Sequence, residues 1–208
     1  MAGTSKKKMQ KMTFISAIIS LLSFGYKMTM GVYTLSMVLM VASISTLMVF
    51  ICKALFVKNV LETRVKKKKA YLFMALAVFL YTLLFIAFAV LKVNGIDTAK
   101  KNPFDGLLGI LFIAVTFVLF ILSLFGLKGA LENTDIMVIG LKEMTFVAAL
   151  ADLVIIEEFA SMIVLKYVEF EYMPKVNGFF ALGVCLLMLI ISVIMLVRFA
   201  KYNREAKK

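Results

Sequence analysis

Long apolar runs separated by short charged stretches dominate the chain. The runs lie at residues 12–28, 30–57, 70–91, 106–127, 144–165 and 178–199. About 18 or more consecutive apolar residues suffice for a helix that crosses a bilayer, and no stretch between the runs is long enough to fold separately. The pattern therefore predicts an all-α integral membrane protein with about six transmembrane helices, forming a single transmembrane domain over residues 1–208.

The fifth run, residues 144–165, combines membrane length with three acidic residues, Asp152, Glu157 and Glu158. An acid near the centre of a spanning helix costs about 2.5–3.5 kcal/mol, and each Leu, Ile, Phe or Val returns about 0.3–0.6 kcal/mol. The eleven such residues of this run return about 5 kcal/mol, whereas three acids cost about 8 kcal/mol at the centre. We therefore expect this helix to insert with the help of neighbouring helices, surrounded by protein or beside a water-filled cavity.

The three acids do not share one face of this helix, because Glu157 lies about 140° and Glu158 about 240° from Asp152 at 100° per residue. Intramembrane carboxylates are typical of ion, proton or substrate sites, so Asp152, Glu157 and Glu158 are candidate ligand-binding or ion-binding residues. Two alternatives stay open: protonated or hydrogen-bonded acids that hold the bundle together, and a segment that does not cross. Lys53 is a possible ion-pair partner of Asp152, or extends its amine toward the headgroups.

The first run, residues 12–28, allows three interpretations. Ser16, Ser20 and Ser23 recur on one face, which favours a short transmembrane helix whose serines pack against a neighbour. An interfacial amphipathic helix and a signal peptide cleaved after Ser23-Phe24-Gly25 are the alternatives.

Gly25 and Gly31, on either side of Lys27, predict a tight turn into the second run. Residues 133–135 predict a turn or a helix cap. Residues 136–141 are then expected to lie along the membrane interface before the fifth run begins.

The distribution of lysine and arginine predicts the orientation. Six spans with both termini cytoplasmic place 18 of the 24 basic residues inside and 6 outside, whereas a four-span alternative places 11 inside and 13 outside. The positive-inside rule thus favours six spans over four. We expect the protein to lie in the cell membrane. The run Lys66, Lys67, Lys68 and Lys69 marks the cytoplasmic side most strongly, and we expect it to contact anionic lipid headgroups.

Composition narrows the chemistry. The chain is 63% hydrophobic, has a mean hydropathy of +1.01 and a net charge of +12, with its basic residues flanking apolar runs. This placement favours membrane lipids over nucleic acid as partners. The chain has no histidine, no phosphate-binding glycine loop and no paired metal ligands, so we expect no enzyme activity, metal or cofactor. Cys52 and Cys185 fall toward opposite sides of the bilayer, which argues against a disulfide.

Two functions fit these observations. The first is a small transporter or channel-like protein that binds a cation, proton or cationic substrate at Asp152, Glu157 and Glu158, with six helices arranged as two inverted three-helix repeats. The second is a non-catalytic membrane subunit or scaffold, as a homo-oligomer or with a protein partner whose basic residues meet the acids. In size and helix number only, the chain resembles the substrate-binding subunits of energy-coupling-factor transporters.

Overall fold

A computed structural model describes residues 2–59, 63–94, 107–133, 135–165 and 173–205, which form six helices and no strand. The helices are α1 (Ala2–Thr34), α2 (Met37–Asn59), α3 (Arg64–Val93), α4 (Leu107–Leu131), α5 (Ile136–Leu165) and α6 (Met173–Glu205). The predicted all-α membrane bundle is thus confirmed. Five of the helices, all except α5, are long and apolar enough to cross a membrane.

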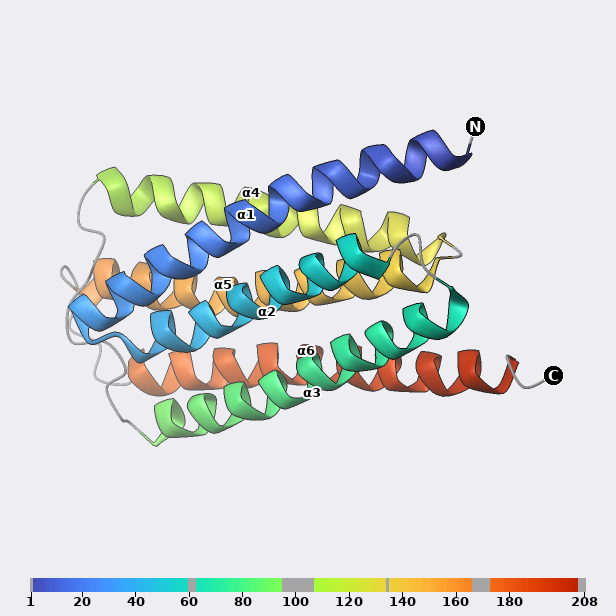
Figure 1. The fold of residues 1–208 in the computed structure, drawn as a ribbon. Coiled ribbons are helices and arrows are strands. Elements are labelled where there is room, and N and C mark those ends of the chain that lie inside the picture. Colours follow the sequence, from blue (N-terminus) through green and yellow to red (C-terminus); the bar gives the residue numbers. More distant parts are fainter. Residues whose placement is uncertain (1, 60–62, 95–106, 134, 166–172, 206–208) are drawn as a thin grey trace.

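The helices run side by side along one direction in three tiers, α1 with α4, α2 with α5, and α3 with α6 (Figure 1). Both chain ends lie at one end of the bundle, which we call the terminal end, and the opposite end is the far end. The closest packing joins α1 to α2, α3 to α6, and α4 to α5. Helix α5 also packs against α2, α3 and α6, so it is the central helix of the bundle.

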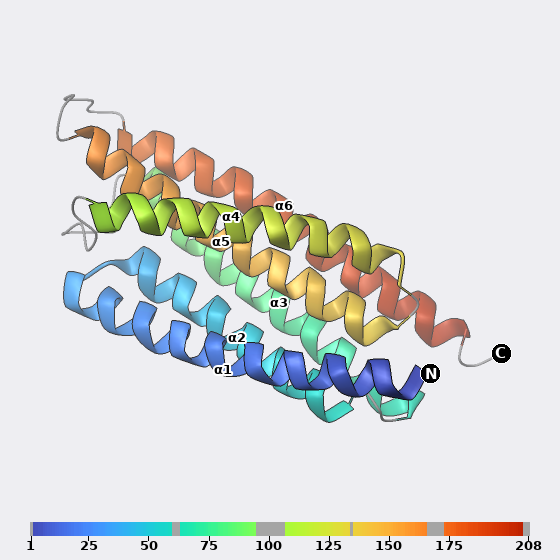
Figure 2. The same ribbon diagram turned by 90° about the horizontal axis from the view of Figure 1, so that it is seen from above.

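Four helices, α2, α3, α5 and α6, supply the buried apolar core. Within the described residues, the backbone of α1 approaches only α2, and that of α4 approaches only α5. Figure 2 shows α1 and α4 on separate sides of the bundle. The backbones of the two outer helices therefore do not approach each other within the described residues.

Helix α1 has its polar side inward. It buries Thr13, Ser20, Lys27 and Thr34 against the bundle, whereas its outward face exposes large apolar side chains such as Phe14 (56%) and Leu22 (69%). In water this arrangement would be unfavourable, because most of the large apolar side chains of α1 would be exposed. In lipid it is favourable, because apolar side chains face the acyl chains and small polar groups make the helix contacts.

The first hairpin differs from its prediction. Instead of turning around Lys27, α1 continues through Gly25 and Gly31, and the chain turns at Leu35, the described non-glycine residue with a positive φ (54°). The helix need not end at Lys27, because that side chain finds a polar partner inside the bundle. Gly31 is instead a packing residue, since a Cβ there would lie 3.0 Å from the backbone nitrogen of Met40.

The start of α5 confirms one prediction and corrects another. Asp135 caps the helix, with its Oδ1 accepting a hydrogen bond from the Met137 backbone N–H at 3.1 Å. The following residues, predicted as an interfacial stretch, are the first turns of α5 itself. The helix is therefore 30 residues long, about 45 Å, and runs beside its neighbours for the length of the bundle (Figure 1).

Candidate functional site

The acids of α5 find lysines within the same chain. Asp152 pairs with Lys27 at 2.5 Å, and Glu158 pairs with Lys92 at 2.7 Å. The possible pair of Asp152 with Lys53 is therefore replaced by one with Lys27, because α1 continues as a helix far enough to bring Lys27 opposite Asp152. Lys53 instead donates to the hydroxyls of Ser16 and Ser20, at 2.8 and 2.7 Å.

The Lys27–Asp152 pair lies near the middle of the bundle. Asp152 is 16 residues into α5, about 24 Å along a helix of about 45 Å. The ammonium of Lys27 also donates to Thr46 Oγ1 of α2 at 3.2 Å, so three helices meet at this point. Charged groups persist at this depth only when they are paired and hydrogen-bonded, and both conditions are met here.

A second pair lies toward the far end. Lys92, in the last turn of α3, and Glu158 are both almost fully buried, with 4% and 5% of their side chains exposed. Glu157 is connected differently, because the hydroxyl of Ser161 donates to it at 3.1 Å and lies at the same distance from Asn177 Oδ1 of α6. Glu158 thus contacts Lys92 of α3, whereas the adjacent Glu157 contacts Ser161 of its own helix.

Further polar contacts lie at the terminal end. Lys67 of α3 pairs with Asp135 at 2.6 Å. Glu143 of α5 accepts a hydrogen bond from the Tyr71 hydroxyl at 3.2 Å and pairs with Arg198 of α6. Glu143 lies just outside the predicted run 144–165 and has no distinguishing neighbour, so its buried position could not be predicted from the sequence.

The four consecutive lysines 66–69 separate into two pairs. Lys67 bonds to Asp135, and Lys68 donates to Asn203 and lies 5.8 Å from the centroid of the Phe199 ring. Lys66 and Lys69 instead line a shallow hollow between α2 and α3, of about 360 Å³. Lys67 and Lys68 thus bond within the bundle, and the contact of the four lysines with anionic lipid stays a prediction.

The helices divide into two similarly packed halves, α1–α3 and α4–α6. In each half the first helix packs on the second, and the second on the third. Because each half has three helices, they run in opposite directions, and α2 meets α5 while α3 meets α6 across the boundary. The symmetry is approximate, since the contact of α3 with α5 has no equivalent between α2 and α6.

The polar contacts concentrate at the boundary between these halves. Lys27–Asp152, Lys67–Asp135 and Lys92–Glu158 each take the base from the first half and the acid from the second. They lie near the middle, the terminal end and the far end respectively. Separating the halves at either end therefore requires breaking at least one of these pairs.

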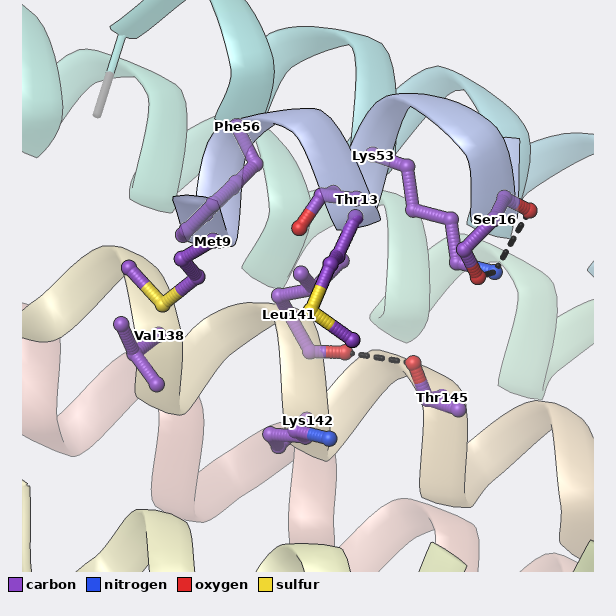
Figure 3. A pocket seen from close by; sticks show the side chains of 10 residues that line it. Met9, Thr13, Ser16, Lys53, Phe56, Val138, Leu141, Lys142 and Thr145 are labelled. Atoms are coloured by element: carbon purple, nitrogen blue, oxygen red, sulfur yellow. Dashed lines mark hydrogen bonds between the residues drawn. The ribbon is translucent and has the colours of Figure 1, made fainter. Parts of the chain in front are cut away.

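A cavity of about 540 Å³ opens between α1, α2 and α5, nearer the terminal end than the Lys27–Asp152 pair. Figure 3 shows Lys53 on one side of it, beside Ser16, and Lys142 on the other. Thr13, Ser16 and Ser20 follow the inward face of α1 from this cavity toward Lys27. A row of hydroxyl groups therefore leads from the cavity in the direction of the central ion pair.

The fold and these buried pairs define a polytopic α-helical membrane protein. Comparison with protein-family models, with curated proteins and with solved structures finds no match. Among the described residues, no group of three or more cysteine or acidic side chains is placed to hold a metal ion. Cys52 and Cys185 are free thiols, both buried.

Proposed function

We propose that the protein is a proton-coupled membrane transporter in which Asp152 and Lys27 form the proton-exchange site. The observation that carries the proposal is their 2.5 Å contact near the middle of the bundle, between two oppositely oriented halves. Intramembrane acids of this kind are typical of proton relays and substrate sites. The site includes the hydroxyl of Thr46 as a third polar group.

The arrangement of the halves supports a transport cycle. Many secondary transporters consist of inverted repeats that rock around a site near the membrane midplane. Here the boundary between the halves carries ion pairs near both ends as well as the central one. Such a bundle has the contacts needed to close each end in turn while the central pair exchanges its proton.

A proton is favoured over a metal cation by the charges around the site. Asp152 already has a cationic partner, the Lys27 ammonium at 2.5 Å, which a metal cation would have to displace. Protonation of Asp152 would leave Lys27 as a buried charge without its counterion. Breaking a buried pair in this way costs about 3–5 kcal/mol, which is enough to shift the bundle toward another arrangement.

The alternative is a non-catalytic subunit in which the pairs only hold the helices together. Its support is the outward face of α4, which exposes Phe117, Val118 and Leu122 and which the described residues leave uncovered. The expectation that a partner chain supplies bases for the acids is corrected for Asp152 and Glu158, whose lysines lie in the same chain. A subunit of this kind would co-purify with a stoichiometric partner protein.

The test is proton uptake by liposomes that contain the purified full-length protein, under an imposed pH gradient or membrane potential, with a pH-sensitive dye inside. We expect Asp152→Asn, and the double variant Lys27→Met with Asp152→Asn, to lower protein-dependent uptake at least ten-fold. Thr82→Val is the matched control, because Thr82 is fully buried and, among the described residues, bonds only within α3, to the Val78 carbonyl.

The double variant separates transport from stability. Removing one partner of a buried pair destabilises by about 3–5 kcal/mol, whereas removing both is often nearly neutral. We therefore expect thermal unfolding in detergent to show a low midpoint for Asp152→Asn and a largely restored one for the double variant. A double variant that is stable and retains wild-type proton uptake would make the pair a structural contact and favour the subunit alternative.

A further inference from the structure

The cavity between α1, α2 and α5 contains two lysines and no acid among its lining residues. Three other lysines of the described bundle, Lys27, Lys67 and Lys92, each meet a carboxylate. Among the described residues, Lys53 donates only to α1 oxygens, those of Ser16 and Ser20. The positive charge of this cavity therefore has no counterion among its described walls.

The positive charge of Lys142 is compensated even less than that of Lys53. Among the described residues it makes no hydrogen bond or ion pair, and its side chain extends along α4, where a Cβ on Gly126 would lie 3.4 Å from its Nζ. Gly126 thus leaves room for the lysine stem beside α4. The Lys142 side chain is exposed and lines the cavity, so a molecule in the membrane can reach its amine.

Both lysines lie at the same depth. Lys53 precedes the end of α2 by six residues, and Lys142 follows the start of α5 by six residues, which places each about 9 Å inside the terminal end. A hydrocarbon core of about 30 Å centred on α5, which is about 45 Å long, would have its boundary near this level. The rest of the cavity wall is largely apolar, with Met9, Phe56 and Leu141.

We infer that this cavity binds one anionic phospholipid from the leaflet at the terminal end, with its phosphate between Lys53 and Lys142. The hydroxyl of Thr13 lines the same cavity and supplies a hydrogen-bond donor for a phosphate oxygen. The hydroxyl of Thr145 donates to the Leu141 carbonyl at 2.8 Å, so its oxygen can accept a hydrogen bond from the lipid. The apolar side chains of the cavity contact the upper part of an acyl chain, and the remainder of the chain continues into the surrounding lipid. The site is distinct from the hollow with Lys66 and Lys69 on the other side of α2.

The test is native mass spectrometry of the full-length protein in mild detergent, titrated with phosphatidylglycerol or phosphatidylcholine. We expect one phosphatidylglycerol to be retained in preference to phosphatidylcholine. The double variant Lys53→Met with Lys142→Met should weaken its binding at least ten-fold. The control removes two exposed lysines outside the cavity, Lys58→Met with Lys128→Met, and should leave binding unchanged at the same net charge.

Two further variants test the cavity in other ways. The first leaves the net charge unchanged, and the second is expected to leave folding undisturbed. Thr145→Phe keeps both lysines but fills the cavity, and should also abolish preferential binding. Lys142→Met alone removes an exposed side chain with no bonding partner among the described residues, so it should fold normally and still weaken binding. Unchanged binding in Thr145→Phe would place the lipid outside the cavity and overturn the inference.

The remaining outcomes identify other sources of the same chemistry. Equal losses in the two double-lysine variants would show general surface electrostatics rather than a site. Displacement of the lipid by millimolar glycerol phosphate would indicate a site for a soluble phosphate. Equal retention of phosphatidylglycerol and phosphatidylcholine would show that the lysines do not select the headgroup. Any of these results would overturn the assignment to an anionic phospholipid.

Discussion

Lys27 and Asp152 are 125 residues apart in the chain and 2.5 Å apart in the bundle. Their separate sequence contexts give little sign of this relation. Lys27 lies between two glycines and has the local pattern of an exposed turn, whereas Asp152 stands out because it interrupts an apolar run. The acids were therefore predictable as candidate site residues, but their partners were not, because the pairing depends on where α1 ends.

Glycine positions give a direct test of the packing between α3 and α6. A Cβ at Gly178 would lie 2.6 Å from the backbone nitrogen of Val93, whereas a Cβ at Gly183 meets no atom within 4 Å. We expect Gly178→Ala to destabilise by about 1–3 kcal/mol, because backbone atoms must move apart.

Gly183→Ala is the matched control on the same helix, and we expect it to be neutral or to stabilise by about 0.5–1 kcal/mol through helix propensity. Thermal unfolding of both variants in one detergent gives the comparison. Similar unfolding midpoints for the two would contradict the close approach of α6 to α3 at this point.

At the scale of whole elements, helix number and type followed from the apolar runs, and the helix ends did not. Apolar length predicts which segments cross a bilayer, because transfer of side chains into lipid dominates that choice. The ends of α1 and α5 depend on polar groups that are satisfied only in the folded bundle, such as Lys27 and Glu143. Both helices therefore extend beyond the runs that predicted them.

The turn between α1 and α2 allows a test of how much a left-handed backbone conformation lowers the stability of the protein. Leu35 has a φ of 54° and is 58% exposed, so its side chain contributes little packing. A left-handed conformation costs an L-residue about 1–2 kcal/mol, which glycine avoids. We expect Leu35→Gly to stabilise the protein by about 1 kcal/mol in thermal unfolding.

Leu35→Ala is the control for this position, because it removes the apolar side chain and keeps the Cβ that makes the conformation unfavourable. It should leave the unfolding midpoint close to that of the wild type. A gain in Leu35→Ala as large as in Leu35→Gly would assign the effect to the exposed side chain instead of the backbone.

The whole molecule places both termini at one end, as the six-span prediction requires (Figure 1). The ion pairs leave the charge asymmetry behind the predicted orientation unchanged. Two of the six lysines counted on the outside, Lys27 and Lys92, are in ion pairs, and so are two of the bases counted inside, Lys67 and Arg198. Without these four, 16 basic residues inside face 4 outside, the same excess of 12 as in the full count of 18 against 6.

Orientation is measurable by labelling single cysteines in intact cells with a membrane-impermeant maleimide. In a background with Cys52→Ala and Cys185→Ala, we expect Tyr33→Cys, 79% exposed near the far end, to react from outside. Lys201→Cys, exposed at the terminal end, should react only after permeabilisation, because the positive-inside rule places that end in the cytoplasm. The reverse pattern would invert the predicted topology.

The division of charge between the halves also constrains how the protein is made. The bases Lys27, Lys67 and Lys92 leave the ribosome before their acids, all of which lie on α5 or its cap. Until α5 is synthesised, the nascent membrane segments hold lysines without counterions. The α5 segment, too acidic to insert favourably alone, meets those lysines as it arrives. The ion pairs can therefore form only late in synthesis, when α5 has been made. A chain truncated before α5 would be a target for membrane quality-control proteases.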